Sequence, residues 1–169
     1  MAQLYALGIF SRLAELNAMK FFLLLSLLFF SACASVKNEG WTAKDNAAIN
    51  NLTSYARSLL GTPYKYGGNS PVSGFDCSGF VGHVFRHTWD IKLPRSSVEI
   101  SHLGHASSRG NLRAGDLVFF NSFTHVGIYL DDDHFIHAPS SGGSVRMENM
   151  RDTYWKKHYD GARRITLRG

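Results

Sequence analysis

The hydrophobic pattern of the chain changes its period part-way along the sequence. Between residues 44 and 60 the apolar positions recur at helical spacing, and Gly61 followed by Pro63 ends the pattern. A second helical pattern begins at Cys77. The apolar positions that define the two patterns are Ile49, Leu52, Ala56, Leu59 and Leu60 in the first, and Phe80, Val81, Val84 and Phe85 in the second. The front half of the domain is therefore predicted to be helical.

A short capped helix within residues 93–105 separates these helices from a region with strand periodicity. Ser96 or Ser97 is expected at its start, with Glu99 near the third position of a capping box. Strands are then predicted over 116–120, 125–130, 134–138, 144–148 and 163–167. Helices first and antiparallel strands afterwards predict one α+β domain.

The strands over 125–130 and 134–138 also predict which residues share a face. The apolar residues of both strands fall on even positions, whereas His125 and His137 occupy odd ones. Burying both even sets on one face requires an odd-numbered loop, most simply the three residues 131–133. His125 and His137 then lie on the opposite face as diagonal neighbours, close enough for one imidazole to orient the other.

The N-terminus carries an apolar run that is too short to span a bilayer. Lys20 precedes the ten-residue segment FFLLLSLLFF, and small residues follow it, which is typical of a secretory signal. FSAC, residues 30–33, resembles the lipobox of bacterial lipoproteins, so Cys33 is the predicted lipidation site. We expect a signal peptide over 1–33, with Met19 as an alternative start, a linker over 34–43 and one folded domain over 44–169. A buried core helix and an uncleaved membrane anchor are the alternatives for the apolar run.

Length and charge limit the remaining possibilities. A chain of 169 residues can bury one sizeable core, and a formal net charge of +5 favours an anionic partner. Nucleic acid, a membrane surface and a carboxylate-rich polymer all fit that charge. Export argues against nucleic acid, which would require the signal to be false. With Cys33 lipidated, the second cysteine, Cys77, has no disulfide partner.

Cys77 has two interpretations, as an inert buried filler or as a nucleophile. It lies at the predicted start of a helix, where unpaired amides and the helix dipole favour a thiolate. His125 could act as its base and His137 could hold His125, which completes an arrangement for acyl transfer to water. Buried cysteines are commonly inert, so spacing alone leaves both interpretations open.

Metal-binding interpretations are weaker. Paired histidines at helical spacing lack a third ligand at a motif-like distance, and the acidic residues 131–133 are typical of a solvated turn. The histidine pairs are His83 with His87, and His102 with His105. Arg95 could hold a substrate carboxylate or form a structural ion pair, and the sequence favours neither. No metal or organic cofactor is predicted.

Seven short segments, taken together, resemble the NlpC family of cell-wall cysteine peptidases. In order along residues 45–166 they are GTPYKYGG (61–68), DCSGF (76–80), LPR (93–95), LRAGDLVFF (112–120), HVGIYL (125–130), FIHA (135–138), and YW (154–155) with GARRI (161–165). The resemblance implies a papain-like α+β fold, with N-terminal helices packed on a central antiparallel sheet. It also implies hydrolysis of peptidoglycan stem peptides.

The same resemblance assigns roles to individual residues. Cys77 matches the nucleophile, His125 the general base and His137 the third polar residue. Tyr64 matches a tyrosine that helps to stabilise the oxyanion, and Asp76 and Ser78 match positions that line the substrate cleft. Two departures, Tyr66 for a frequent Trp and Glu99 for a common Gln, fall outside the triad and put specificity in question more than activity.

These inferences predict a monomeric, lipid-anchored cysteine endopeptidase that faces the periplasm. The residues after Cys33 are Ala34 and Ser35 rather than Asp, which favours the outer membrane. The bond cut is either the γ-D-glutamyl-diaminopimelate link within a stem or the D-alanyl-diaminopimelate cross-link between stems. The alternative is a non-catalytic wall-binding scaffold lipoprotein of the same fold.

Overall fold

The computed structural model describes residues 42–140 and 143–167, all of which fall within the compact unit Trp41–Gly169. The predicted signal peptide, the lipobox Cys33 and most of the predicted linker lie outside the described residues. Among the described helices, none is both long and apolar enough to span a membrane.

Two helices open the described chain, as the apolar spacing predicts. α2 (Ala43–Ser58) begins with a capping box in which Thr42 and Asp45 satisfy each other's backbone amides, and it ends two residues before the predicted Leu60. α3 (Cys77–Trp89) has Asp76 as its N-cap and Asp90 as its C-cap, and Asp90 adopts a left-handed conformation with φ 55°. The loop between the helices contains a small ladder of β1 (Asn69–Ser70) and β2 (Gly74–Phe75).

A six-stranded antiparallel sheet forms the rest of the domain. Its spatial order is β3-β8-β4-β5-β6-β7, so the last strand of the chain lies between β3 and β4. Three strands agree closely with their predicted segments. The bounds are β3 (His105–Ser107), β4 (Leu117–Phe120), β5 (His125–Tyr129), β6 (His134–His137), β7 (Arg146–Asn149) and β8 (Tyr159–Arg164). β8 begins four residues before the predicted 163–167, and β3 was not predicted.

Three short helices complete the described structure. α4 (Ser97–Ile100) has the predicted capping box, with Ser96 as N-cap and Glu99 as its partner. η1 (Arg109–Asn111) and α5 (Thr153–His158) were not predicted. α5 buries only Trp155, so it has no apolar periodicity for a sequence pattern to detect.

The predicted register of the β5–β6 hairpin is confirmed. Ile128 lies opposite Ile136, and the backbone amide of Leu130 donates to the carbonyl of His134 at 2.9 Å. The connection is the three-residue loop 131–133, in which Asp132 and Asp133 have φ of 44° and 61°. This odd loop length places His125 and His137 on one face of the sheet.

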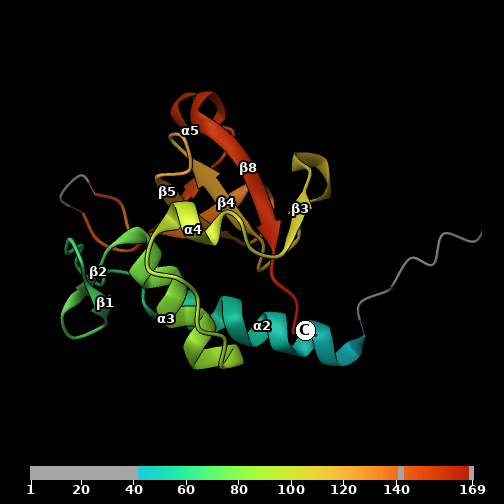
Figure 1. The fold of residues 1–169 in the computed structure, drawn as a ribbon, viewed down its shortest axis with the longest axis horizontal. Helices are drawn as coiled ribbons and strands as arrows, with labels where there is room; N and C mark the ends of the chain where they lie inside the picture. The colour runs from blue at the N-terminus through green and yellow to red at the C-terminus, as the bar shows by residue number, and fades with distance from the viewer. Residues whose placement is uncertain (1–41, 141–142, 168–169) are drawn as a thin grey trace, which may run out of the picture. The chain divides into compact units, whose positions relative to one another are not determined.

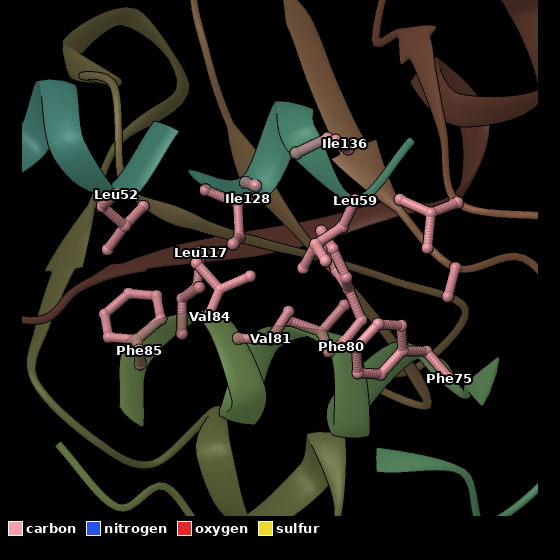
Figure 2. Packing of buried hydrophobic residues seen from close by; sticks show 14 of the residues in the cluster. Leu52, Leu59, Phe75, Phe80, Val81, Val84, Phe85, Leu117, Ile128 and Ile136 are labelled. Carbon is pink, nitrogen blue, oxygen red and sulfur yellow. The ribbon is translucent and has the colours of Figure 1, made fainter. Parts of the chain in front are cut away.

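Both faces of the sheet are covered, by different elements. Figure 1 shows α2 and α3 next to each other on one side of the strands, with α5 near the far end of β8. Figure 2 shows Leu52 and Leu59 of α2 and Val81 and Val84 of α3 in one cluster with the strand residues Leu117 and Ile128. A smaller cluster on the other face contains Val118, Phe120, Phe135, Met150, Trp155 and Ala162. The histidine face of the hairpin is therefore packed against aromatic side chains rather than open to water.

Candidate active site

Cys77 is the first residue of α3, and its half-buried thiol lies beside the strand that carries His125. Its Sγ lies 3.9 Å from the carbonyl oxygen of Thr124, the residue before His125. The position follows from the N-cap. The Asp76 carboxylate accepts a hydrogen bond from the Gly79 amide at 2.7 Å, so Asp76 caps the helix and Cys77 is its first residue. The structure thus places Cys77 at the helix N-terminus, as predicted.

Asp76 is a hub that fixes the start of the helix to two other segments. Its carboxylate accepts hydrogen bonds from Arg95 Nη1 at 3.0 Å, from Arg95 Nη2 at 2.5 Å and from the Gly67 amide at 3.0 Å. Burial alone would raise the pKa of Asp76, but the bonds from Arg95 and from the two glycine amides outweigh burial and lower it. Asp76 therefore stays ionised beside the thiol.

Arg95 and Ser78 both belong to this hub. Arg95 Nη1 also donates to Ser78 Oγ at 2.8 Å, and the Ser78 hydroxyl lies 3.2 Å from Asp76 Oδ1. The structure thus realises the ion-pair interpretation of Arg95, although half of its side chain remains exposed toward the cavity. A role in holding a substrate carboxylate remains a prediction.

His125 and His137 are directly hydrogen-bonded. Nε2 of His125 lies 2.7 Å from Nδ1 of His137, with the ring planes at 89°. Trp155 stacks on His125 with the ring centroids 5.7 Å apart and meets His137 edge-on at 5.1 Å. Because its Nε2 is engaged by His137, His125 has Nδ1 as the ring nitrogen left for Cys77.

Burial disfavours an isolated charge on either reacting group. It raises the pKa of the Cys77 thiol, and the nearby Asp76 carboxylate adds to that rise, while hydrogen bonds from the amides of Val126 and Ser78 oppose it. Burial, with the neighbouring His137, lowers the pKa of His125 to about 3. Burial therefore outweighs the helix dipole at Cys77, and both the thiol and the His125 ring are neutral at rest.

A strained turn delivers His125 to the site. Asn121, Ser122 and Phe123 all have left-handed φ angles, between 57° and 60°. The turn is held by Phe123 N donating to Asp160 Oδ2 at 2.9 Å and by Thr124 Oγ1 donating to the Asn121 carbonyl at 2.6 Å. Three consecutive non-glycine residues in this region are costly, and such strain typically occurs at functional sites.

The predicted site residues, apart from Cys33 and His137, line one cavity of about 630 Å³. Its walls include Cys77 and His125, together with the predicted binding residues Tyr64, Asp76, Ser78 and Arg95. Burial, Asp76 and Cys77 raise the pKa of Tyr64, so its hydroxyl stays protonated and able to donate. A second cavity of about 770 Å³ shares Asn121, His125 and Ser140 with the first. His125 therefore borders both cavities.

Sequence reasoning missed three contributors to the site. The turn 121–124 has no glycine to indicate its left-handed backbone, and Trp155 lies in a helix without periodicity. Glu148 on β7 lies next to buried His137, with 3.5 Å between Glu148 Oε2 and His137 Nε2. The alternation of β7 could have placed Arg146 and Glu148 on one face, but not opposite His137.

Other polar clusters have structural partners. His83 Nε2 lies 2.9 Å from the Tyr55 hydroxyl, and His87 stacks on the Tyr55 ring at 3.9 Å. Asp131 pairs with Arg57 at 3.3 Å. Within residues 42–140 and 143–167, no three metal-ligating side chains of the His, Cys, Asp or Glu type converge.

Comparison with known proteins agrees with this geometry. The sequence model of the NlpC/P60 family matches residues 61–164. The chain is 45% identical over 111 residues to the Murein DD-endopeptidase MepS/Murein LD-carboxypeptidase of Escherichia coli K12, covering 64% of this chain and 58% of that protein. It is 35% identical over 156 residues to the Gamma-DL-glutamyl hydrolase of Bacillus subtilis 168, covering 88% and 37%.

The fold agrees as well. A crystal structure of an NlpC/P60 family protein from Bacillus cereus superposes with a TM-score of 0.65 at 34% identity, covering 69% of this chain and 39% of that one. The chain spans little more than half the length of the first curated relatives it matches. The order of the motifs, the papain-like α+β architecture and the match over residues 61–164 lead to one conclusion: the chain belongs to the NlpC/P60 family.

Proposed function

We propose that this protein is a cysteine endopeptidase that hydrolyses stem peptides of peptidoglycan. The observation that carries the proposal is the constellation of Cys77 at the N-terminus of α3, His125 on the wall of the same cavity, and His137 bonded to His125 at 2.7 Å. These are a nucleophile, a base and the group that orients the base. A non-catalytic scaffold would not need all three in place.

The first half of the reaction forms an acyl-enzyme. Nδ1 of His125 takes the thiol proton as Cys77 Sγ attacks the scissile carbonyl carbon. The resulting oxyanion accepts hydrogen bonds from the Cys77 backbone amide and from the Tyr64 hydroxyl. His125 then gives the proton to the leaving amine, the C–N bond breaks, and a thioester on Cys77 remains.

The second half regenerates the enzyme. A water molecule loses a proton to His125 as its oxygen attacks the thioester carbonyl. The C–S bond then breaks, the stem peptide leaves as a carboxylic acid, and the proton returns to Cys77. Every proton transfer uses His125 Nδ1, so the hydrogen bond of its Nε2 to His137 can persist throughout the cycle.

The D-alanyl-diaminopimelate cross-link is the favoured bond. The Escherichia coli relative, at 45% identity, is named a murein DD-endopeptidase. The two cavities that His125 borders also suit a substrate that continues beyond the scissile bond. The γ-D-glutamyl-diaminopimelate link is the second candidate, since the Bacillus subtilis relative is a gamma-DL-glutamyl hydrolase.

Digestion of purified sacculi separates the two bonds. Cross-link cleavage converts dimeric muropeptides into monomers with intact stems, whereas γ-D-glutamyl cleavage leaves disaccharides carrying only a dipeptide. After a muramidase has cut the glycan strands of the treated sacculi, mass spectrometry of the muropeptides distinguishes these products. A muropeptide profile identical to that of untreated sacculi would contradict both candidates.

We further propose that the enzyme acts as a monomer anchored by lipid on Cys33, in the outer membrane and facing the periplasm. The basic, exported character of the sequence and its lipobox resemblance support this placement. Radiolabelled palmitate should enter the wild-type protein but not Cys33→Ala, and the label should fractionate with outer membranes. Label in the alanine variant, or a soluble periplasmic wild-type protein, would contradict the anchor.

A further inference from the structure

His137 has one ring nitrogen that the Cys77–His125–His137 arrangement does not use. Its side chain is fully buried, Nδ1 is bonded to His125, and Nε2 has no hydrogen bond of good geometry within the described residues. A buried polar nitrogen without a hydrogen-bond partner lowers the stability of the fold, so the groups nearest to it need to be identified. The nearest charged group is Glu148, whose Oε2 is 3.5 Å from Nε2.

The carboxylate of Glu148 is held in place from its other side. In the pairing of β6 with β7, His137 lies opposite Arg146 and Phe135 lies opposite Glu148. Arg146 Nε donates to Glu148 Oε1 at 2.5 Å, which leaves Oε2 turned toward the imidazole. The side chain of Glu148 is only 21% exposed, so water screens this interaction weakly.

We propose that Glu148 is a positioning residue that extends the site to Cys77–His125–His137–Glu148 and selects the tautomer of both histidines. The inference rests on the proposed peptidase function and deepens it. A carboxylate facing Nε2 of His137 requires a proton on that nitrogen, which makes Nδ1 an acceptor. His125 must then donate its Nε2–H to Nδ1, and its own Nδ1 keeps the lone pair that Cys77 needs.

Glu148 also has an electrostatic effect on the reaction. When His125 takes the thiol proton, its imidazolium faces His137, and the charges of Glu148 and Arg146 lie beyond that ring. The charged group beside Cys77 is Asp76, which is paired with Arg95. The His137 ring and Arg146 keep the pKa of Glu148 at about 2, so it is ionised across the working pH range. Its negative charge favours the imidazolium, and removing it leaves Arg146 unopposed.

The pH profile gives a readout that a purely structural role would not move. The Cys77–His125 pair is active while it holds one proton, and two macroscopic pKa values bound that window. A negative charge nearby raises both values, so Glu148→Gln should move both limbs of the rate profile to lower pH by roughly 0.5 unit. The rate at the optimum should fall about tenfold, with KM within about twofold of wild type.

The tautomers themselves can be observed in the full-length protein without substrate. All proteins would carry Cys33→Ser, so that Cys77 is the only thiol. Long-range nitrogen–proton NMR of the histidine rings should show His137 protonated at Nε2 in the parent protein and a mixture of tautomers in Glu148→Ala. Alkylation of Cys77 by iodoacetamide at neutral pH should be several times slower in both Glu148 variants, because the thiolate–imidazolium pair is less populated.

Asp131→Asn is the matched control. Asp131 is an exposed carboxylate in the hairpin loop, pairs with Arg57 of α2 and lies outside the site. The substitution should leave the tautomers, the alkylation rate and both pH limbs unchanged. The proposal would be overturned by a folded Glu148→Ala protein with the parent tautomers together with a folded Glu148→Gln protein whose pH limbs are unshifted. If the parent protein does not cut peptidoglycan, the NMR and alkylation results still decide the role of Glu148 separately from the proposed function.

Discussion

Two glycines in α3 provide a matched test of how the helix is fixed to the loop that carries Tyr64. A Cβ at Gly79 would lie 2.0 Å from the carbonyl oxygen of Gly68 and 3.0 Å from Asp76 Oδ1. A Cβ at Gly82 would meet nothing within 4 Å. Replacing a helical glycine by alanine stabilises by about 0.5–1 kcal/mol when space allows, so Gly82→Ala should raise the free energy of unfolding by that amount.

Gly79→Ala should have the opposite sign. Relieving the contact requires Gly68 to retreat by about 1 Å or more, which strains the bond from the Asp76 amide to the Gly68 carbonyl and the bond from the Gly67 amide to Asp76. We expect a loss of about 1–3 kcal/mol relative to wild type, and therefore a difference of roughly 2–4 kcal/mol between the two variants. At about 3 °C per kcal/mol, their melting temperatures should differ by roughly 6–12 °C.

Urea unfolding followed by tryptophan fluorescence measures this difference, and thermal unfolding checks it. The reasoning would be refuted if Gly79→Ala were as stable as Gly82→Ala, because the loop would then yield without cost. Hydrolysis should separate the variants too, since displacing the loop moves Tyr64 and the Asp76 hub.

Two further predictions concern the charges of the domain. Burial and His137 lower the pKa of His125 to about 3, so as pH falls below about 6.5 this imidazole is protonated in the unfolded chain before it is protonated in the folded one. The free energy of unfolding should therefore fall between about pH 6.5 and pH 3, by at most about 1.4 kcal/mol per pH unit. His125→Gln should reduce this pH dependence, which urea unfolding at pH 7 and pH 4 measures. An equal slope in both proteins would show that the ring is not kept neutral by the fold. The carboxylate of Asp116 is buried, lies 2.6 Å from Arg164 Nη2 and accepts a hydrogen bond from the Arg113 amide. Asp116→Ala should therefore lower the free energy of unfolding by about 3 kcal/mol. Asp131→Ala removes an exposed pair with Arg57 and should lower it by less than about 1 kcal/mol. Comparable losses in the two alanine variants would refute the importance of burial at the first pair.

Local patterns were enough to predict the parts of the site that depend on periodicity and caps. The parity of apolar positions around His125 and His137, together with an odd loop, placed both histidines on one face and within reach of each other, and in the structure they are hydrogen-bonded. The start of α3 at Cys77 followed from a change to helical spacing. Both predictions hold because they use interactions between residues that are close in sequence.

Features set by pairing between distant segments could not be predicted in this way. β8 enters the sheet between β3 and β4, so the short β3 exists only because β8 supplies its partner. Similarly, Glu148 reaches His137 because of the β6–β7 register, which no hairpin rule fixes across the intervening residues. The thiol pKa was also misjudged, because burial, which raises it, depends on packing around Cys77 rather than on its place at a helix end.

The central claim is that Cys77 is the nucleophile of a peptidoglycan endopeptidase. The most direct measurement is the loss of cross-linked dimeric muropeptides, counted after muramidase digestion, from purified sacculi that were treated with the wild-type protein or with Cys77→Ala at equal concentrations of folded protein. We predict cross-link cleavage by the wild type and none above background by the variant, because no other described residue at the site can form the thioester. Hydrolysis by Cys77→Ala at the wild-type rate would contradict the claim.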